Sequence, residues 1–185
     1  VFQNPDHQIF SETVFDEVSF GPRLRGLPEA DIKARVSEAL TAVGLEGTEQ
    51  EDPFSLTKSG RQRVAVAAVL AVKPDVLILD EPTTGLDYGE QRSMMEMVKQ
   101  LNENGSTIIF ITHHMWVVAE YARKVFVIKD GRVLLEGTAR EVFSHEQELA
   151  TASLRPPHFI QFTNRLGSTM LRPAELVECL EGATA

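Results

Sequence analysis

The chain has 185 residues, enough for one sizeable domain or for one domain with a small appendage. Its 27 acidic against 18 basic residues give a net charge of −9, which disfavours a protein that binds the phosphate backbone of nucleic acids. The longest unbroken apolar run, residues 64–72, is too short to span a bilayer. The single cysteine, Cys179, permits no internal disulfide, as is typical of a reducing compartment, and we expect it to pack in a helix.

The first 73 residues divide into a short strand end and a helical region. Residues 1–5 are typical of a strand that runs into a loop, and residues 11–73 are predicted to be helical. One helix is predicted to begin at Pro28 and to end at Gly44. Residues 55–60 are predicted to form a polar loop before an apolar helix over 61–72. The apolar face of the helix that follows Pro28 comprises Ile32, Val36, Ala39, Leu40 and Val43.

Residues 74–144 alternate between strand and helix signals, which predicts a parallel sheet with crossover helices. The all-apolar run 76–79 predicts a buried parallel strand, and residues 107–111 predict the next strand. Asp87 with Glu90 predicts a capping box for a helix through about residue 99, and residues 115–123 predict another helix. Residues 125–128 and 132–136 flank Asp130-Gly131, a hairpin signal, and Thr138 with Glu141 caps a short closing helix.

Residues 145–185 form a separate carboxyl-terminal extension with a different pattern. Pro156-Pro157 interrupts the chain, and a second helix is predicted to begin at Pro173 and to end before Gly182. We expect the apolar residues of the extension to pack on the core or on a partner subunit. Those of the first helix are Phe159, Ile160, Phe162 and Leu166, and those of the second are Leu176, Val177 and Leu180.

Two carboxylates follow the predicted strand 76–79 in the order Asp80-Glu81-Pro82. Open α/β sheets bind ligands at the carboxyl ends of their strands. A carboxylate pair there suits a magnesium nucleotide, because one oxygen can bind the ion and one base can position water. An ordinary turn with solvated charges is the alternative that these three residues alone leave open.

The order of four segments resembles the ATP-binding-cassette (ABC) ATPases. They are residues 55–63, the run Leu77-Ile78-Leu79-Asp80-Glu81-Pro82, Gly85-Leu86-Asp87, and Thr112-His113. The resemblance implies an α/β fold: a P-loop NTPase core of the ABC type, a parallel sheet with flanking helices, carrying an inserted helical subdomain and a small helical carboxyl-terminal extension. It divides the chain into four parts. The strand end and glutamine loop comprise residues 1–10, and the helical subdomain comprises residues 11–73. The nucleotide-binding core comprises residues 74–144, and the carboxyl-terminal extension comprises residues 145–185. No stretch fits the phosphate-binding loop G-x-x-x-x-G-K-[ST], so we expect the core to lack its amino-terminal part.

The resemblance assigns roles to individual residues, with ATP and Mg²⁺ as ligands. Asp80 corresponds to the magnesium-site acid and Glu81 to the base for the attacking water. His113 corresponds to the histidine that contacts the γ-phosphate, and His114 stands where the family usually has aspartate. Gln3 corresponds to the glutamine that reaches the metal or the attacking water and faces the membrane partner. Residues 2–10 are similar to the ATPases of energy-coupling-factor importers, which take up vitamins and cobalt or nickel.

Residues 56–60 align with the family signature LSGGQ, which contacts ATP bound by a second subunit. Thr57 keeps the hydroxyl, Lys58 and Ser59 replace two glycines, and Gly60 replaces glutamine. Ser59 adds a Cβ where backbone approaches phosphate, so we expect an impaired loop. Asp87 corresponds to an aspartate that contacts the partner subunit, a role that capping a helix does not exclude.

The implied function is the ATP-hydrolysing subunit of an energy-coupling-factor importer for a vitamin or a transition-metal ion. The implied partners are a second ABC ATPase, either a paralogue or a second copy, and a transmembrane coupling protein, at the cytoplasmic face of the membrane. No nucleic-acid partner is expected. The alternatives are the ATPase of another ABC transporter and a degenerate assembly subunit that does not hydrolyse ATP. Intact Asp80, Glu81 and His113 argue against the degenerate subunit, and the altered signature supports it.

Overall fold

The computed structural model describes residues 1–182, and the last three residues of the predicted extension lie outside them. The chain forms two compact units, the first over Val1–Ile111 and the second from Thr112 onward. Each unit has its own buried apolar residues, so each is described by itself.

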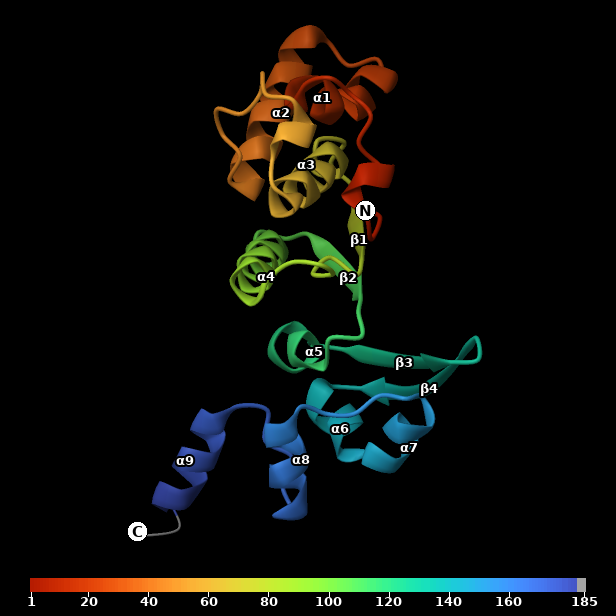
Figure 1. Ribbon diagram of the computed structural model, residues 1–185, viewed down its shortest axis with the longest axis vertical. Helices are drawn as coiled ribbons and strands as arrows, with labels where there is room; N and C mark the ends of the chain where they lie inside the picture. The colour runs from red at the N-terminus through yellow and green to blue at the C-terminus, as the bar shows by residue number, and fades with distance from the viewer. Residues whose placement is uncertain (183–185) are drawn as a thin grey trace. The chain divides into compact units, whose positions relative to one another are not determined.

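The first unit begins with three helices that pack on one another, α1 (Val14–Leu24), α2 (Glu29–Val43) and α3 (Lys58–Leu70) (Figure 1). Two short 3-10 turns, η1 (Pro5–His7) and η2 (Pro53–Ser55), contact α3. α2 confirms its prediction. Pro28 precedes its first turn, Gly44 ends it in the left-handed region at φ 70°, and all five predicted apolar residues are buried.

A parallel pair of strands, β1 (Val76–Asp80) and β2 (Thr107–Ile111), completes the first unit, with α4 (Tyr88–Glu103) as the crossover between them (Figure 1). The parallel pairing is confirmed, but the prediction that residues 76–79 are all buried is wrong. Leu77 and Leu79 are buried, whereas Val76 and Ile78 are 44% and 51% exposed. Successive side chains of a strand point to opposite faces, and only one face of β1 is covered in this unit.

Arg63 connects three helices of the first unit. Its Nη1 donates to the carbonyl oxygen of Val43 at the end of α2 (2.5 Å), and its Nη2 donates to Ser93 Oγ in α4 (2.8 Å). Burial lowers the pKa of the Arg63 guanidinium. A cation at the carboxyl end of α2 is favourable, because the helix dipole places partial negative charge there.

The second unit contains an antiparallel hairpin, β3 (Val125–Lys129) and β4 (Arg132–Gly137), and short helices. Asp130 (φ 51°) and Gly131 (φ 73°) both take the left-handed conformation that a two-residue hairpin turn requires, which confirms the hairpin. The helices are α5 (Met115–Tyr121), α6 (Ala139–Ser144), α7 (Glu146–Thr151), α8 (His158–Arg165) and α9 (Pro173–Gly182). One buried cluster joins α5, β3, α6, α7 and α8: Val118, Val127, Ala139, Val142, Phe143, Leu149 and Ile160.

Four predicted boundaries are wrong by a few residues. α4 continues to Glu103, whereas its end was expected at about residue 99. α5 ends at Tyr121 rather than at residue 123, because Ala122 already has extended backbone (ψ 128°). α9 includes Gly182, which was expected beyond its end. Lys58 opens α3, so residues 58–60 belong to the first helical turn and not to a loop. The physical reason for the last correction is the cap made by Thr57, described below.

Helices α8 and α9 are held to the rest of the second unit by polar contacts. Asn164 Nδ2 in α8 donates to the carbonyl oxygen of Phe143 (2.9 Å) and to Glu146 Oε1 (2.6 Å). Arg140 in α6 forms an ion pair with Glu175 in α9 (2.6 Å). Part of the apolar surface of the extension still faces solvent, since four side chains are 52–60% exposed: Phe162, Leu166, Val177 and Leu180.

Candidate functional site

The two predicted carboxylates lie at the carboxyl end of β1. Asp80 is the last residue of the strand and is exposed, and it pairs with Ile111, the last residue of β2. The backbone N–H of Glu81 donates to the carbonyl oxygen of Ile111 (2.9 Å), and Glu81 itself has φ 46°. A non-glycine residue in the left-handed region is uncommon and concentrates at functional sites. This conformation ends the strand and sends Glu81 in a different direction from Asp80.

Glu81 is also tied to the turn that follows it. The backbone N–H of Thr84 donates to the carbonyl oxygen of Glu81 (3.1 Å), and Thr84 Oγ1 donates to Glu81 Oε2 (3.4 Å). Both bonds close the turn over Pro82 and Thr83, which are buried. The carboxylate of Glu81 is therefore oriented by its own loop.

Gln3 lies at the same end of the sheet as the carboxylates. The N–H of Val1 donates to the carbonyl oxygen of Ile78 (2.8 Å), and the N–H of Asp80 donates to the carbonyl oxygen of Val1 (3.1 Å). This pattern is that of a parallel pair with Val1 opposite Leu79, so the chain passes the end of β1 as it reaches Gln3. Gln3 thus follows a backbone segment that pairs with the end of β1, and its side chain is exposed.

His113 belongs to the second unit, two residues after Ile111. Its ring packs edge-on against the ring of His114, with 4.5 Å between ring centroids. The backbone N–H of His114 donates to Thr112 Oγ1 (3.0 Å). The place of His113 beside the carboxylates of the first unit stays a prediction.

The signature segment, residues 57–60, forms the start of α3. Thr57 is the N-cap, and its Oγ1 accepts from the backbone N–H of Gly60 (3.1 Å). Ser59 is only 8% exposed, so its Cβ is accommodated within the helix. A Cβ on Gly60 would lie 3.0 Å from Leu56 Cβ, which is tight, so a larger side chain there requires Leu56 to shift.

Lys58 reaches from the signature segment to the loop that follows β1. An ideal Cβ on Gly85 would lie 2.2 Å from Lys58 Nζ, so the lysine side chain passes directly over this glycine. Gly85 has φ 74°, which only glycine adopts without strain. Two residues later, Asp87 Oδ1 accepts from the N–H of Glu90 (2.9 Å) and Glu90 Oε2 accepts from the N–H of Asp87 (3.2 Å), which confirms the capping box of α4.

The carboxylates fit the modest demand of a magnesium site. Among residues 1–182 no three histidine, cysteine, aspartate or glutamate side chains lie close enough together to hold a metal ion. Magnesium nevertheless needs only one or two protein carboxylates when substrate phosphates and water complete its shell. An exposed Asp80 at the end of β1 meets this need, whereas a permanent, all-protein metal site is not supported by the described residues.

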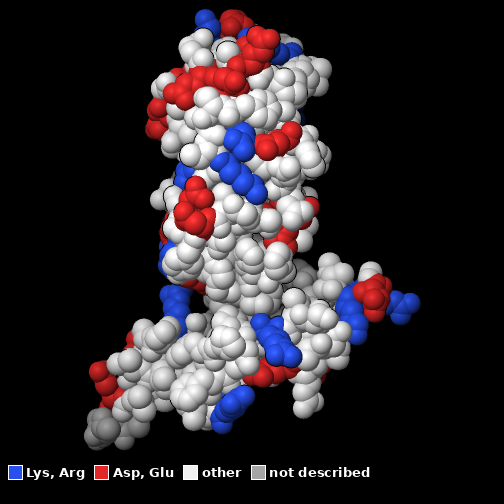
Figure 2. All heavy atoms as spheres, in the orientation of Figure 1, with Lys and Arg blue, Asp and Glu red and all other residues white. Residues whose placement is uncertain are grey.

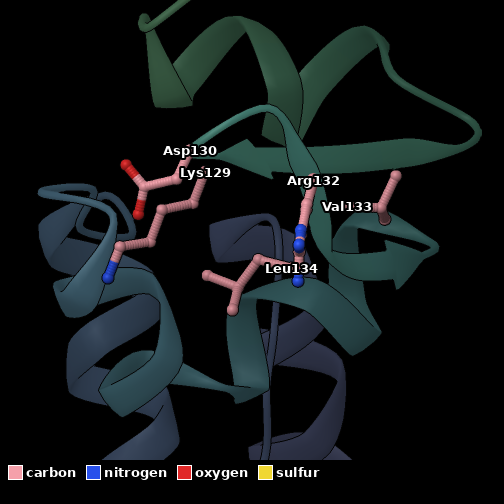
Figure 3. Close-up of a pocket in the computed structure, with 5 residues that line it drawn as sticks. All are labelled: Lys129, Asp130, Arg132, Val133 and Leu134. Atoms are coloured by element: carbon pink, nitrogen blue, oxygen red, sulfur yellow. The ribbon is translucent and has the colours of Figure 1, made fainter.

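A hollow of about 530 Å³ lies beside the hairpin turn and is lined by residues of the segment 129–134, which is distant in the sequence from Asp80 and Glu81. Lys129 and Asp130 project on one side of it and Arg132 on the other, with Leu134 between them (Figure 3). None of the predicted site residues lines this hollow. On the face seen in Figure 2, basic side chains form separate groups interspersed with acidic ones, without a continuous basic stripe.

Three residues that the sequence did not single out hold the site in place. Gln8 Nε2 donates to the carbonyl oxygen of Ala65 in α3 (3.0 Å), and Arg61 Nε donates to Asp6 Oδ1 (2.6 Å). Asp6 and Arg61 are 55 residues apart. Their opposite charges are an ordinary feature of a sequence with this composition, so no local signal could have paired them.

The sequence matches the family model described as ABC transporter over residues 1–84. A putative ABC transporter ATP-binding protein of Caldanaerobacter subterraneus is 60% identical over 178 residues, 96% of this chain and 31% of that protein. An energy-coupling factor transporter ATP-binding protein, EcfA, of Methanocaldococcus jannaschii is 47% identical over 168 residues, 89% of this chain and 60% of that protein. The chain therefore spans between about a third and three fifths of the length of these relatives.

A solved structure supports the same relationship at the level of the fold. It is cbiO1 from Clostridium perfringens, described as part of the ABC transporter complex cbiONQ, with a TM-score of 0.74 and 40% sequence identity. The match covers 90% of this chain and 65% of the cbiO1 chain. The α/β fold expected from the sequence is thus confirmed as the fold of ABC ATPases.

Proposed function

Because the chain belongs to the ABC transporter ATP-binding family, we propose that it is part of the ATP-hydrolysing subunit of an importer of the energy-coupling-factor type. The observation that carries the proposal is the pair of carboxylates, Asp80 and Glu81, at the carboxyl end of β1, with the segment that leads to Gln3 hydrogen-bonded to the same strand. Because the chain spans only part of the length of its relatives, the activity is proposed for a protein that contains both this chain and a phosphate-binding loop, here called the complete ATPase.

Each residue has a distinct role in the proposed reaction. Asp80, together with Gln3, would hold Mg²⁺, which supplies charge neutralisation on the phosphates of ATP. Glu81 accepts a hydrogen bond from the attacking water and orients it, with Thr84 restraining its carboxylate. His113 donates to the γ-phosphate. Most of the rate comes from positioning, because phosphoryl transfer requires little covalent chemistry from the protein.

The signature segment acts on ATP bound to another subunit in this proposal. Thr57 and the backbone at the start of α3 face the γ-phosphate, with the helix dipole favouring an anion. Lys58 adds a positive charge, while Ser59 and Gly60 depart from the signature glycine and glutamine. Asp87 contacts the partner subunit from its place at the cap of α4.

The partners follow from the same assignment. A second ATPase subunit completes the nucleotide sites, and a transmembrane coupling protein docks near Gln3 at the cytoplasmic face of the membrane. Relatives named EcfA and the cbiO1 structure, part of a cbiONQ complex, support this class of partner. Among residues 1–182 no helix is both long enough and apolar enough to cross a membrane. The proposed cargo is a vitamin or a transition-metal ion.

ATP turnover by the complete ATPase, alone and with a partner subunit, tests the proposal. We expect Mg²⁺-dependent hydrolysis, whereas the 185-residue chain alone should bind magnesium ATP weakly in calorimetric titration and hydrolyse none. No turnover by the complete ATPase with any partner would favour the assembly subunit instead, a possibility that the altered Ser59-Gly60 pair supports. Micromolar affinity of the isolated chain for magnesium ATP would show that the missing loop is not needed for binding.

A further inference from the structure

The loop that carries Gln3, residues 2–8, is attached to helix α3 by the side chain of Gln8. Gln8 Oε1 accepts from the backbone N–H of Phe2 (3.2 Å), and Gln8 Nε2 donates to the carbonyl oxygen of Ala65 in α3 (3.0 Å). One side chain therefore connects the residue before Gln3 to the middle of the signature helix.

A second connection runs through Arg61. Its Nε donates to Asp6 Oδ1 (2.6 Å), and its Nη1 donates to the carbonyl oxygen of Leu56 (2.6 Å). Leu56 immediately precedes Thr57, the N-cap of α3. The guanidinium thus links the Gln3 loop to the backbone at the entrance of the signature segment.

This arrangement differs from the other ion pairs of the first unit. The side chains of Arg23–Asp16, Lys73–Glu38 and Lys99–Glu96 are all at least 45% exposed, and exposed pairs contribute little. The Asp6 side chain is 42% exposed, but the Arg61 side chain is only 19% exposed, and its planar fork makes two bonds to two separate segments. Charge-assisted bonds of this kind are stronger and more specific in geometry than a single surface contact.

We propose that Asp6 and Arg61 are positioning residues that fix the signature segment relative to Gln3, so that the two move as one body. Neither residue touches the reacting atoms; they act through the backbone at Leu56 and the loop at Gln3. A displacement of Gln3 by nucleotide or membrane partner is then passed to Thr57 through the Asp6–Arg61 bridge. The effect of this bridge on ATP turnover rests on the proposed function, whereas its effect on the position of the signature segment does not.

Hydrogen exchange in the complete ATPase tests the structural content. The N–H groups of Gly60 and Arg61 donate to Thr57 Oγ1 (3.1 Å) and to the carbonyl oxygen of Thr57 (2.9 Å), so their exchange reports on the signature segment. In Asp6→Asn we expect about tenfold faster exchange there, since a charge-assisted bond is lost. Glu38→Gln, which breaks the pair with Lys73 (2.7 Å), is the matched control and should leave these amides unchanged. Equal exchange in the two variants would overturn the proposal.

Steady-state kinetics test the consequence. In Asp6→Asn we expect kcat to fall roughly tenfold while the KM for ATP changes little, because misplacement of a positioned group affects the reacting geometry. Arg61→Lys, which keeps the charge but cannot make the forked pair of bonds, should lose part of the same activity without unfolding. A change confined to KM, or none, would overturn the coupling. If the wild-type ATPase hydrolyses no ATP, the proposed function fails, whereas faster exchange in Asp6→Asn would still support the bridge.

Discussion

At the scale of single residues, Glu81 is distinguished by its backbone as much as by its carboxylate. Its φ of 46° is unusual for a residue with a side chain, and it is maintained by the bond from its N–H to Ile111 and by the turn to Thr84. Such conformations persist where surrounding contacts over-determine them. In a regular strand, adjacent side chains already point to opposite faces. The left-handed conformation of Glu81 additionally turns the chain away from the strand axis, so the two carboxylates point in different directions.

Glu81→Gln in the complete ATPase should abolish most turnover while ATP still binds. The amide keeps the shape of the side chain but cannot accept a proton, so we expect turnover to fall about a hundredfold or more. The ATP-bound dimer should accumulate and be visible by gel filtration. Glu103→Gln, at the exposed end of α4, is the control. Wild-type turnover in Glu81→Gln would remove this residue from the mechanism.

Two substitutions of Asp87 separate its two roles. Asp87→Ala should lower the free energy of unfolding by about 1 kcal/mol, because the capping box of α4 is lost, whereas Asp87→Asn should retain most of the cap. If the carboxylate contacts the partner subunit, both variants should weaken ATP-dependent pairing. Thr138→Ala, in the second capping box, provides a reference for the stability change alone. Wild-type pairing in Asp87→Asn would reduce Asp87 to a helix cap.

At the scale of elements, helix α2 and helix α4 show how a glycine can be either required or replaceable. Gly44 ends α2 with φ 70°. An ideal Cβ on Gly44 would lie 3.6 Å from Arg63 Nη1, an ordinary contact, so only backbone strain disfavours a side chain there. Gly89 lies in the first turn of α4, and an added Cβ would approach Asp87 Oδ1 at an ordinary 3.4 Å. Backbone conformation, rather than space, therefore decides the two cases.

Gly44→Ala and Gly89→Ala should change stability in opposite directions. Gly44→Ala should destabilise the protein by about 1 kcal/mol, because alanine is strained at positive φ. Gly89→Ala should stabilise it by about 0.5 kcal/mol through helix propensity. Urea unfolding of both variants against wild type measures the difference. A stabilising Gly44→Ala would show that the left-handed turn is not retained in solution.

At the scale of the whole molecule, the carboxyl-terminal extension combines a buried part with an exposed part. We expect deletion of residues 155–185 to weaken subunit pairing, but because Ile160 is buried in the second unit, the deletion would also expose that unit's own core. Val177 and Leu180 are 52% and 60% exposed, so they can be changed without opening it. In energy-coupling-factor ATPases the extension joins the two ATPase subunits, and we propose the same use here.

Val177→Asp with Leu180→Asp should weaken pairing of ATPase subunits without abolishing nucleotide binding. Two charges on an apolar contact surface must be desolvated when subunits associate, which is unfavourable. Analytical ultracentrifugation of the complete ATPase would measure the association. Leu24→Asp, at a side chain 78% exposed in α1, is the control for a charge on an exposed apolar residue. Unchanged association would mean that the extension covers only its own unit.

The altered signature segment predicts an asymmetric pair of ATPase subunits. A site built from Asp80, Glu81 and His113 should be competent when a partner supplies a standard signature, and the opposite site should hydrolyse ATP slowly. Loss of one well-placed contact to the γ-phosphate costs ~2.7–4 kcal/mol, a hundredfold or more in rate. We therefore favour a heterodimer with a paralogous ATPase over a homodimer.

Ser59→Gly combined with Gly60→Gln should raise turnover of a homodimer. A Cβ on Gly60 would lie 3.0 Å from Leu56 Cβ, so Gly60→Gln crowds Leu56. Ser59→Gly alone avoids this crowding and is therefore measured beside the double variant. Turnover with each candidate partner measures the effect. Unchanged activity in the homodimer for both variants would make the altered signature neutral and end the argument for asymmetry.

Features that depend on residues a few positions apart could be predicted from the amino-acid sequence. The apolar period and Gly44 identify α2, Asp87 with Glu90 identifies the start of α4, and Asp130-Gly131 identifies the hairpin. The same holds for Asp80-Glu81 as a pair of carboxylates after a strand, because chain direction places them at its carboxyl end. Capping bonds and turns close within one turn of chain, so local sequence suffices to predict them.

The contacts between distant segments that support the site could not be predicted from the sequence and became visible in the folded chain. The passage of Lys58 over Gly85, the Asp6–Arg61 ion pair and the one-sided burial of β1 all depend on how helices and strands pack. Their energies come from contacts between residues far apart in the chain, and composition gives no means of choosing one pairing among many.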